Sequence, residues 1–342
     1  MALKTYVVDL KVEMRRKMKG GLSDFLVQKM KETLEKNEQV LLFLNKRGYS
    51  SSIICGACGN TPTCKHCEIS MTYHKTGKDY LLCHYCGLKQ FMTDSCSSCK
   101  TPHSFMHVGT GTQKIEEELF ALFPGRNIKR VDLDSMNKKK AYDELLSDMN
   151  EKKIDILIGT QIIAKGFDFP HVTLVGIVNA DVGLTIPDFR AHERTFSLIT
   201  QVVGRASRKG QDGCVVVQTM LPNHPAISFA LTNDYDGYYE YEIELRKKFH
   251  YPPFTEIVKC TFAHKSEEKA EEMVAKKADE LSETAKTLGN SCHILTAPSY
   301  IAKQQGKYFF HILLIGENPH ELIEKTKFET SWKIDVDPMV TI

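Results

Sequence analysis

The chain has 342 residues, of which 42% are hydrophobic and 26% charged, with 45 Lys and Arg against 43 Asp and Glu. This length gives room for two or three domains with buried cores, and the composition excludes a disordered or fibrous chain. The net charge of +2 indicates no global attraction to nucleic acid. No apolar run approaches the roughly 18 residues of a membrane span, and the charged first 20 residues lack the apolar stretch of a signal peptide. We therefore expect a cytoplasmic protein.

The first two thirds of the chain have the rhythm of an α/β protein. Ser23 caps a predicted helix that runs to about Glu38, and the continuous apolar run 40–44 predicts a strand buried on both faces. Beyond a Cys-rich segment, predicted helices at 115–123, 139–150 and 196–208 alternate with predicted strands at 128–133, 154–159, 172–179 and 213–219. This alternation predicts a parallel sheet covered by helices, which the Cys-rich segment interrupts directly after its first strand.

The last third has a different rhythm. A long predicted helix at 226–249 ends at Pro252-Pro253, and further strands are predicted at 255–263, 293–297 and 307–315 with helices at 266–288 and 319–327. We therefore expect four parts: a linker and lead-in helix (1–38), an α/β lobe (39–50 plus 103–225), a Cys-rich insertion (51–102) and a small α+β domain (226–342).

Eight of the eleven cysteines lie between Cys55 and Cys99, in a chain without an export signal, and are therefore expected to be thiols or metal ligands rather than disulfides. The remaining three, Cys214, Cys260 and Cys292, are expected to be small core residues. The eight form four C-x-x-C pairs: Cys55/Cys58, Cys64/Cys67, Cys83/Cys86 and Cys96/Cys99.

Each pair can present two thiolates to one tetrahedral ion, so the eight predict two closed, structural sites. Nesting suggests that the outer pairs (Cys55, Cys58, Cys96, Cys99) hold one ion and the inner pairs (Cys64, Cys67, Cys83, Cys86) the other, although the spacing also permits sequential pairing. Regular pairs joined by short polar turns favour two Zn²⁺ ions over iron–sulfur clusters. So small and polar a segment has no core of its own without metal.

Two segments of the α/β lobe are candidates for phosphate binding. The loop 159–169 follows a buried strand and contains glycines and small polar residues that let phosphates approach closely, or it is an ordinary strand-to-helix loop. On the predicted helix, Gln201, Arg205 and Arg208 share one face, where the two guanidinium groups can clamp a polyphosphate, or form a solvated basic surface.

Several motifs occur together in an order typical of one family. Asn45-Lys46-Arg47-Gly48-Tyr49, the loop at Thr160-Gln161 and the helix 201–208 resemble the second motor lobe of superfamily-2 helicases. The run 41–50 that opens into four C-x-x-C pairs, together with 181–184, 187–195, 251–254 and 335–338, is far more specific. Over nearly its whole length the chain resembles the carboxyl-terminal half of the PriA family of replication-restart helicases (primosomal protein N′).

The resemblance implies a RecA-like parallel sheet, as the second helicase lobe, with an inserted double zinc-binding module and a small α+β carboxyl-terminal domain. It implies roles for individual residues: Arg205 and Arg208 are catalytic and contact the ATP phosphates, and Gly166, Asp168 and Gln201 line the nucleotide cleft. Contact with the DNA backbone is implied for Thr160, Gln161, Asn45 and Arg47. The eight cysteines match the family's two zinc sites, in the outer and inner pairing.

The function implied is half of an ATP-dependent 3′–5′ DNA helicase, using ATP and Mg²⁺, that recognises stalled or abandoned replication forks and initiates primosome assembly in the bacterial nucleoid. Implied partners are forked and single-stranded DNA, single-stranded-DNA-binding protein, and primosome and replicative-helicase-loading proteins. Because the sequence contains no G-x-x-x-x-G-K-[ST] loop and no Asp-Glu-x-His segment, we predict that this chain alone is inactive. The alternatives are a non-catalytic, zinc-stabilised DNA- or protein-binding module and, less consistent with the cysteines, an RNA motor.

Overall fold

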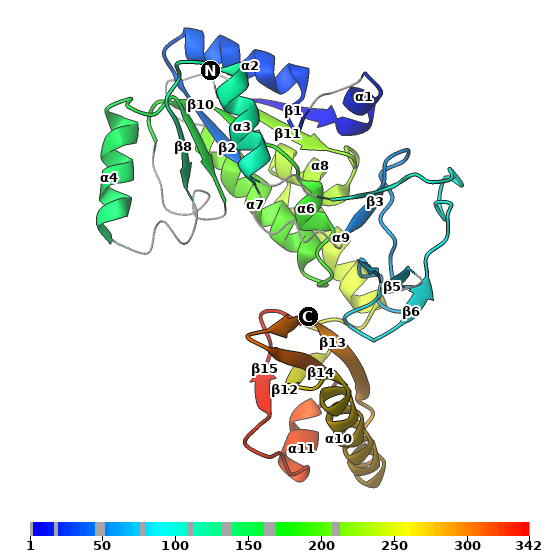
Figure 1. The fold of residues 1–342 in the computed structure, drawn as a ribbon. Coiled ribbons are helices and arrows are strands. Elements are labelled where there is room, and N and C mark those ends of the chain that lie inside the picture. The colour runs from blue at the N-terminus through cyan, green and yellow to red at the C-terminus, as the bar shows by residue number, and fades with distance from the viewer. Residues whose placement is uncertain are drawn as a thin grey trace. The chain divides into compact units, whose positions relative to one another are not determined.

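A computed structural model describes residues 3–16, 20–44, 52–75, 79–108, 112–131, 139–160, 169–206 and 213–341, without side chains for 112, 113, 139, 140, 205 and 206. The chain divides into two compact units (Figure 1). Unit 1 comprises Met1–Asn60, Asp94–Thr185 and Ala191–Tyr238, and unit 2 comprises Thr61–Thr93, Ile186–Arg190 and Tyr239–Ile342. None of the helices in these described ranges combines the length and apolar character needed to cross a bilayer.

Unit 1 is built on a parallel sheet, which confirms the RecA-like fold class. Within the described residues the sheet has six strands in the order β1-β11-β10-β2-β9-β8, every neighbouring pair parallel. The strands are β1 (Lys4–Asp9), β2 (Gln39–Phe43), β8 (Ile128–Val131), β9 (Ile156–Gly159), β10 (Val172–Ile177) and β11 (Cys214–Thr219).

Both faces of this sheet are covered by helices (Figure 1). One face of β2, with Val40 and Leu42, packs in a core cluster with α2 (Asp24–Glu35) and α3 (Thr112–Leu122). The predicted apolar face of α2, with Leu26, Met30 and Leu34, lies in this cluster. On the remaining face α7 (Ala191–Ala206) packs against β10 and β11. All five residues of β2 are buried, including Val40–Phe43 of the apolar run from which burial was predicted.

The other elements of unit 1 are short. They are α1 (Leu10–Arg15), α4 (Lys139–Asn150), α6 (Asp181–Leu184), α8 (Pro225–Thr232), and the antiparallel pair β3 (Ile53–Cys55) and β7 (Phe105–His107). Ile54 and Val108, in and beside this pair, form a second apolar cluster with Leu10, Val182 and Met220. The ribbon β3–β7 thus has its own apolar attachment within the unit. Helix α9 (Tyr235–Lys248) begins at the end of unit 1.

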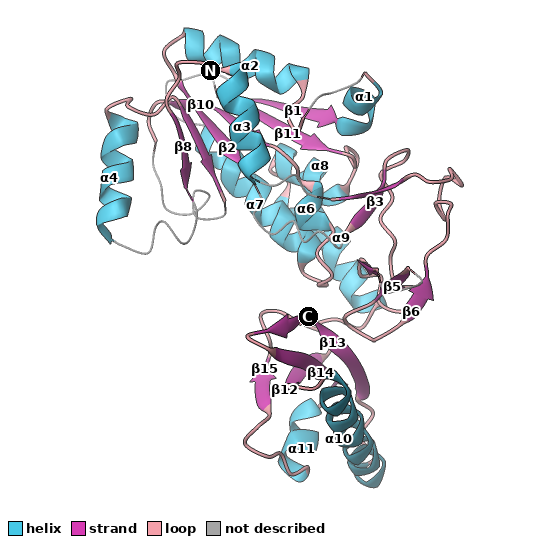
Figure 2. Cartoon of the chain, viewed as in Figure 1, coloured by secondary structure: helices cyan, strands magenta, loops and turns pink. Residues whose placement is uncertain are grey.

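Unit 2 contains an antiparallel sheet with strand order β13-β14-β12-β15 (Figure 2). Its strands are β12 (Glu256–His264), β13 (His293–Gln304), β14 (Lys307–Gly316) and β15 (Lys333–Val336), and its helices are α10 (Glu267–Leu288) and α11 (Pro319–Lys325). A core cluster joins alternate residues of β12 and β14 to Val274 and Leu281 of α10 and to Leu322 of α11. Three short strands, β4 (Thr72–His74), β5 (Tyr80–Leu82) and β6 (Lys89–Phe91), form a second antiparallel sheet, and the inner cysteines lie in the turns before β4 and between β5 and β6.

Several elements differ from the prediction. We expected residues 1–38 to be a linker and lead-in helix, but Lys4–Asp9 pairs with β11, so the cysteines follow the second strand of the sheet rather than its first. The predicted helix 226–249 is two helices, because Asn233 adopts a left-handed φ of 54° and the Asp234 carboxylate then accepts from Gly237 N–H. Strand β13, which was predicted to end at residue 297, continues past Pro298. The pairing with β14 shifts register between Pro298 and Lys303, so the proline need not donate a backbone hydrogen bond to β14. The domain boundaries expected from the sequence otherwise stay predictions.

Candidate metal centres and a buried aspartate

The four C-x-x-C segments fold into the same tight turn. In each, the N–H of the first cysteine donates to the carbonyl five residues later, over 2.8–3.0 Å. The carbonyl of the first cysteine accepts from the N–H of the residue that follows the second cysteine, over 2.7–2.9 Å. That following residue always has a positive φ, which brings the chain back on itself. It is Gly59 (83°), Glu68 (52°), Gly87 (74°) or Lys100 (62°).

The turns pair in the nested arrangement. The sulfurs of Cys55, Cys58, Cys96 and Cys99 all lie within 4.8 Å of one another, and so do those of Cys64, Cys67, Cys83 and Cys86. We call these the outer group and the inner group. The outer group lies in unit 1, at the end of the β3–β7 ribbon, and the inner group lies in unit 2. The sequential pairing that the spacing also permitted is not the one in the structure.

The inner sulfurs compete for protons. Hydrogen bonds among them lower the pKa of Cys64 to about 6 and also lower the pKa of Cys86, whereas the bond to Cys64 raises the pKa of both Cys67 and Cys83. Four thiolates so close together repel one another, so some sulfurs keep their protons unless a cation offsets the charge. A divalent ion at the centre allows all four to ionise.

Both groups fit zinc. Each supplies four sulfurs and no fifth ligand position, which is the ligand set of a structural zinc site. Four sulfurs also suit iron, but regular C-x-x-C pairs joined by short polar turns favour zinc. Since all four positions are filled by protein, these sites contribute folding energy and no chemistry at the metal.

The inner group is fixed to the antiparallel-sheet part of unit 2. The Tyr251 hydroxyl donates to the Cys67 carbonyl (2.5 Å), and His84 Nδ1 donates to the Pro298 carbonyl (2.8 Å) on β13. Burial lowers the pKa of His84 to about 4, so the ring is neutral and its one proton serves this bond. A side chain at Gly87 would strike the Thr296 carbonyl of the same strand, so only glycine permits this approach.

The segment Ile186–Arg190 also belongs to unit 2 and holds the end of the chain. Asp188 accepts from both the backbone N–H (3.1 Å) and the hydroxyl (3.3 Å) of Thr341, which is fully buried. Arg190 donates to the Pro338 carbonyl (3.0 Å) and its guanidinium lies 4.2 Å from the centroid of the Phe189 ring. Residues 187–190 of the motif 187–195, to which the sequence analysis gave no role, are therefore structural in unit 2.

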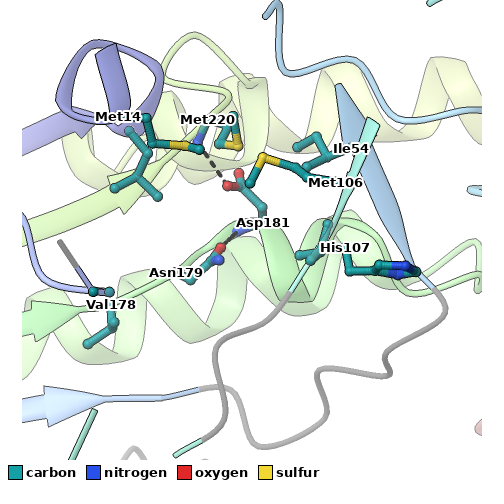
Figure 3. Close-up of a pocket in the computed structure, with 12 residues that line it drawn as sticks. Met14, Ile54, Met106, His107, Val178, Asn179, Asp181 and Met220 are labelled. Atoms are coloured by element: carbon teal, nitrogen blue, oxygen red, sulfur yellow. Dashed lines mark hydrogen bonds between the residues drawn. The ribbon is translucent and has the colours of Figure 1, made fainter. Parts of the chain in front are cut away.

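A cavity of about 180 Å³ lies in unit 1 at the carboxyl ends of β1, β10 and β11 (Figure 3). Its walls are mostly apolar and include Met14, Met106 and Met220, with Ile54 and Met106 supplied by the β3–β7 ribbon. The polar groups are Asn179, His107 and Asp181. The carboxyl ends of parallel strands are the usual place for ligand sites in α/β proteins.

Asp181 is the buried polar centre of this cavity, with 1% of its surface exposed. Its carboxylate accepts from the Thr219 hydroxyl (2.5 Å) and from Met220 N–H (2.8 Å), and its own N–H donates to Asn179 Oδ1 (2.9 Å; Figure 3). Burial raises the pKa of Asp181 to about 6. A carboxylate at this position repels phosphates, so the cavity suits a small apolar group better than an anion.

The residues implied to contact ATP and DNA are only partly described. Gln201 is exposed on α7 and Arg205 lies in the same helix, without a described side chain. Thr160 is 3% exposed at the carboxyl end of β9, and its hydroxyl has no partner among the described residues. Arg208, Gly166, Asp168, Gln161, Asn45 and Arg47 lie outside the described residues.

Two residues that the structure places in buried contacts were given no role from the sequence. They are Asp181 and Phe189, which both lie in motifs noted in the sequence analysis. A signal existed for Asp181, because a carboxylate four residues after the end of a fully buried strand has few sources of solvation. None existed for Phe189 and Tyr251, whose contact joins residues more than sixty positions apart.

Three protein families match the sequence. The helicase conserved C-terminal domain matches residues 88–210, the PriA DNA helicase Cys-rich region (CRR) domain, a zinc ribbon, matches residues 64–90, and the primosomal protein N C-terminal domain matches residues 247–339.

Curated relatives from three bacteria are each named replication restart protein PriA. The relative from Bacillus subtilis is 46% identical over 264 residues, which is 77% of this chain and 32% of the relative. The relative from Borreliella burgdorferi is 36% identical over 98% of this chain and 50% of the relative. The relative from Haemophilus influenzae is 38% identical over 92% of this chain and 42% of the relative. The chain thus spans half or less of the length of these relatives.

Among solved structures, the similarities are weaker. S. cerevisiae Dbp5 bound to RNA and ADP BeF3 is 13% identical, with a TM-score of 0.35 over 72% of this chain and 45% of that chain. The E. coli DEAD-box protein SrmB gives 11% identity and a TM-score of 0.31 over 67% of this chain and 84% of that chain.

Proposed function

Since the chain belongs to the replication restart protein PriA family and corresponds to its carboxyl-terminal half, we propose that it is the second motor lobe, zinc region and carboxyl-terminal domain of an ATP-dependent DNA helicase. The proposed motor moves 3′ to 5′ along one strand, recognises stalled or abandoned replication forks and initiates primosome assembly at the bacterial nucleoid. Its proposed partners are forked and single-stranded DNA, single-stranded-DNA-binding protein and the proteins that load the replicative helicase.

The observation that carries this proposal is the parallel sheet of unit 1 together with the motifs at its carboxyl edge. Phe43 of β2 pairs with Gly159 of β9, and Leu44 N–H donates to the Gly159 carbonyl (2.8 Å). Asn45 and Thr160 therefore follow directly from adjacent strand ends. This supports the proposal that Asn45, Arg47, Thr160 and Gln161 contribute to a DNA-backbone surface.

The nucleotide side of the proposal depends on α7. Gln201 and Arg205 are four residues apart and so share one helix face, and Arg208 follows three residues later. In the proposed mechanism the two arginines stabilise the charge that develops on the phosphates of ATP, and Gly166, Asp168 and Gln201 line the cleft. Mg²⁺ and the phosphate-binding lysine would come from a first lobe that this sequence does not contain.

The proposal is tested in a full-length protein that includes this chain. Arg205→Ala and Arg208→Ala should each lower kcat for DNA-stimulated ATP hydrolysis by about 100-fold or more with DNA binding retained. Arg16→Ala, which removes an arginine from an exposed position of unit 1, is the control and should leave kcat unchanged. Equal activity of all three variants would refute the assignment.

The isolated chain separates this proposal from a non-catalytic binding module. It should bind forked DNA without hydrolysing ATP, because half of the catalytic groups are absent. DNA-dependent ATP hydrolysis by the chain alone would overturn the proposed division of labour. Binding to DNA by the full-length protein with no turnover at all would instead favour the module.

A further inference from the structure

The two cysteine groups differ in their exposure to solvent. In the inner group Cys64, Cys67 and Cys83 are buried and Cys86 is half-buried. In the outer group Cys55 and Cys96 are buried and Cys58 is half-buried, but Cys99 is exposed. Its neighbours Ser97, Ser98 and Lys100 are exposed as well, so no apolar side chain next to it in sequence covers its sulfur.

The exposed sulfur has a partner within reach. Cys99 Sγ lies 3.7 Å from Cys55 Sγ, and Cys58 Sγ lies 3.8 Å from Cys96 Sγ. A disulfide requires about 2.05 Å between the sulfurs, so a local shift of the exposed turn suffices to join Cys99 to Cys55. The inner group has a similar spacing, 3.7 Å between Cys64 and Cys86, but no sulfur as exposed as that of Cys99. Access, rather than distance, therefore distinguishes the two groups.

We propose that Cys99 is a modification site, at which a peroxide oxidises the outer group to a disulfide and releases its metal ion while the inner group stays intact. The Cys99 thiolate attacks one peroxide oxygen, the O–O bond breaks, and the products are a sulfenic acid on Cys99 and hydroxide. The Cys55 thiolate then attacks the Cys99 sulfur, the S–S bond forms, and a second hydroxide leaves. Two thiolates lose two electrons in all, and hydrogen peroxide, with two protons from solvent, becomes two water molecules.

Loss of the outer group has a structural consequence inside unit 1. Cys55 is the last residue of β3, and β3 pairs with β7 through Ile53–His107, Ile54–Met106 and Cys55–Phe105. Ile54 and Met106 of this ribbon line the cavity around Asp181. With two ligands of the ion gone, Cys58 and Cys96 alone do not hold it. The ribbon then keeps its apolar cluster and the bond from the Ser52 hydroxyl to the Thr185 carbonyl, but loses the support of the metal. We expect oxidation to raise hydrogen exchange at the wall of the cavity.

The proposal is tested on the zinc-loaded chain with hydrogen peroxide and a chromophoric zinc chelator. One equivalent of zinc should be released about tenfold faster than the second. Differential alkylation and peptide mapping should locate the first disulfide among Cys55, Cys58, Cys96 and Cys99. Release of both ions at one rate, or a first disulfide among the inner cysteines, would overturn the proposal.

Two matched variants locate the point of attack. Cys99→His keeps four zinc ligands but removes the exposed sulfur, and should slow the first release about fivefold or more. Cys86→His makes the same exchange in the inner group and should leave the rate of the first release unchanged. An unchanged first rate in Cys99→His, with its zinc content verified beforehand, would show that Cys99 is not where oxidation begins. Should Cys99→His fail to retain zinc, the peptide map of the unmodified chain still decides.

Discussion

The ring of Phe189 stacks on the ring of Tyr251, with 4.7 Å between centroids and 11° between the ring planes. The hydroxyl of Tyr251 at the same time donates to the carbonyl of Cys67, one of the inner cysteines. A motif inside the sequence of the α/β lobe, the turn before β12 and a C-x-x-C turn are therefore packed together in unit 2. The contact explains why these three segments belong to one compact unit although they are distant in the sequence.

This contact predicts how Tyr251→Phe behaves. The substitution keeps the stacked ring and removes the hydroxyl, which leaves the Cys67 carbonyl without this donor. We expect a loss of about 1–2 kcal/mol in the free energy of unfolding and faster loss of zinc from the inner group. Urea denaturation and chelator competition measure the two effects. Tyr308→Phe removes a hydroxyl from an exposed pair with Lys303 and should cost about 0.5 kcal/mol or less. Equal effects of the two variants would contradict the prediction.

The buried Asp181 predicts a pH dependence of stability. Burial raises its pKa from 3.8 to about 6, so the folded protein binds this proton more tightly than the unfolded chain does. Its contribution is therefore most favourable at acid pH and is lost as the pH rises between the two pKa values, by on the order of 3 kcal/mol.

Asp181→Asn removes that titration and is the test. The difference in unfolding free energy between the original chain and the variant should fall as the pH rises from about 4 to about 6. Protonation of the zinc thiolates affects both proteins alike, so it cancels in the difference. A difference that is constant over this pH range would show that Asp181 has the same pKa in the folded and unfolded states.

The glycines of the zinc turns predict which substitutions are tolerated. An alanine at Gly59 would place a methyl group against the Met220 carbonyl, and an alanine at Gly87 against the Thr296 carbonyl. We expect each to cost about 2–4 kcal/mol and to weaken zinc binding in its own group only. The reverse changes, Glu68→Gly and Lys100→Gly, relieve a left-handed backbone and should be neutral or stabilising by up to about 1 kcal/mol.

Two other glycines provide controls for these turns. Gly125, with a φ of 83°, and Gly306, with a φ of 77°, have no atoms within 4 Å of an added methyl group. Gly125→Ala and Gly306→Ala therefore measure the cost of the backbone conformation alone, about 1–2 kcal/mol. If Gly59→Ala and Gly87→Ala cost no more than these controls, the close approach to the carbonyls is unimportant.

We expect the removal of zinc to cause loss of structure in some elements of the chain and not in others. The strands β2, β9 and β10 have their own apolar core, so they should keep their protection from hydrogen exchange after chelation. The turns of both cysteine groups, the ribbon β3–β7 and the part of β13 near Pro298 should lose protection, because their partners include the metal-held turns. Simultaneous exchange of the parallel sheet would show that zinc supports the whole of unit 1.

The sequence was most informative where one local cause acts. The run Val40–Leu44 predicted a strand because its residues are all apolar. The C-x-x-C spacing predicted four pairs of metal ligands because a short turn brings the two sulfurs of a pair together, and their nesting suggested the grouping that the structure has. Strand β1 escaped prediction because its alternating pattern depends on a partner, β11, about 210 residues away. The division of the inner and outer groups between two units depends on contacts such as that of Tyr251 with Cys67, which no local pattern records.

The course of the chain through the two units also constrains how it is made. It passes from one unit to the other five times, at 60–61, 93–94, 185–186, 190–191 and 238–239. Cys67 leaves the ribosome 184 residues before Tyr251, the residue whose hydroxyl bonds to its carbonyl. The inner cysteines of the nascent polypeptide therefore lack this packing partner until Tyr251 has been translated, and a gene fragment that stops before β13 would also lack the Pro298 carbonyl that bonds to His84.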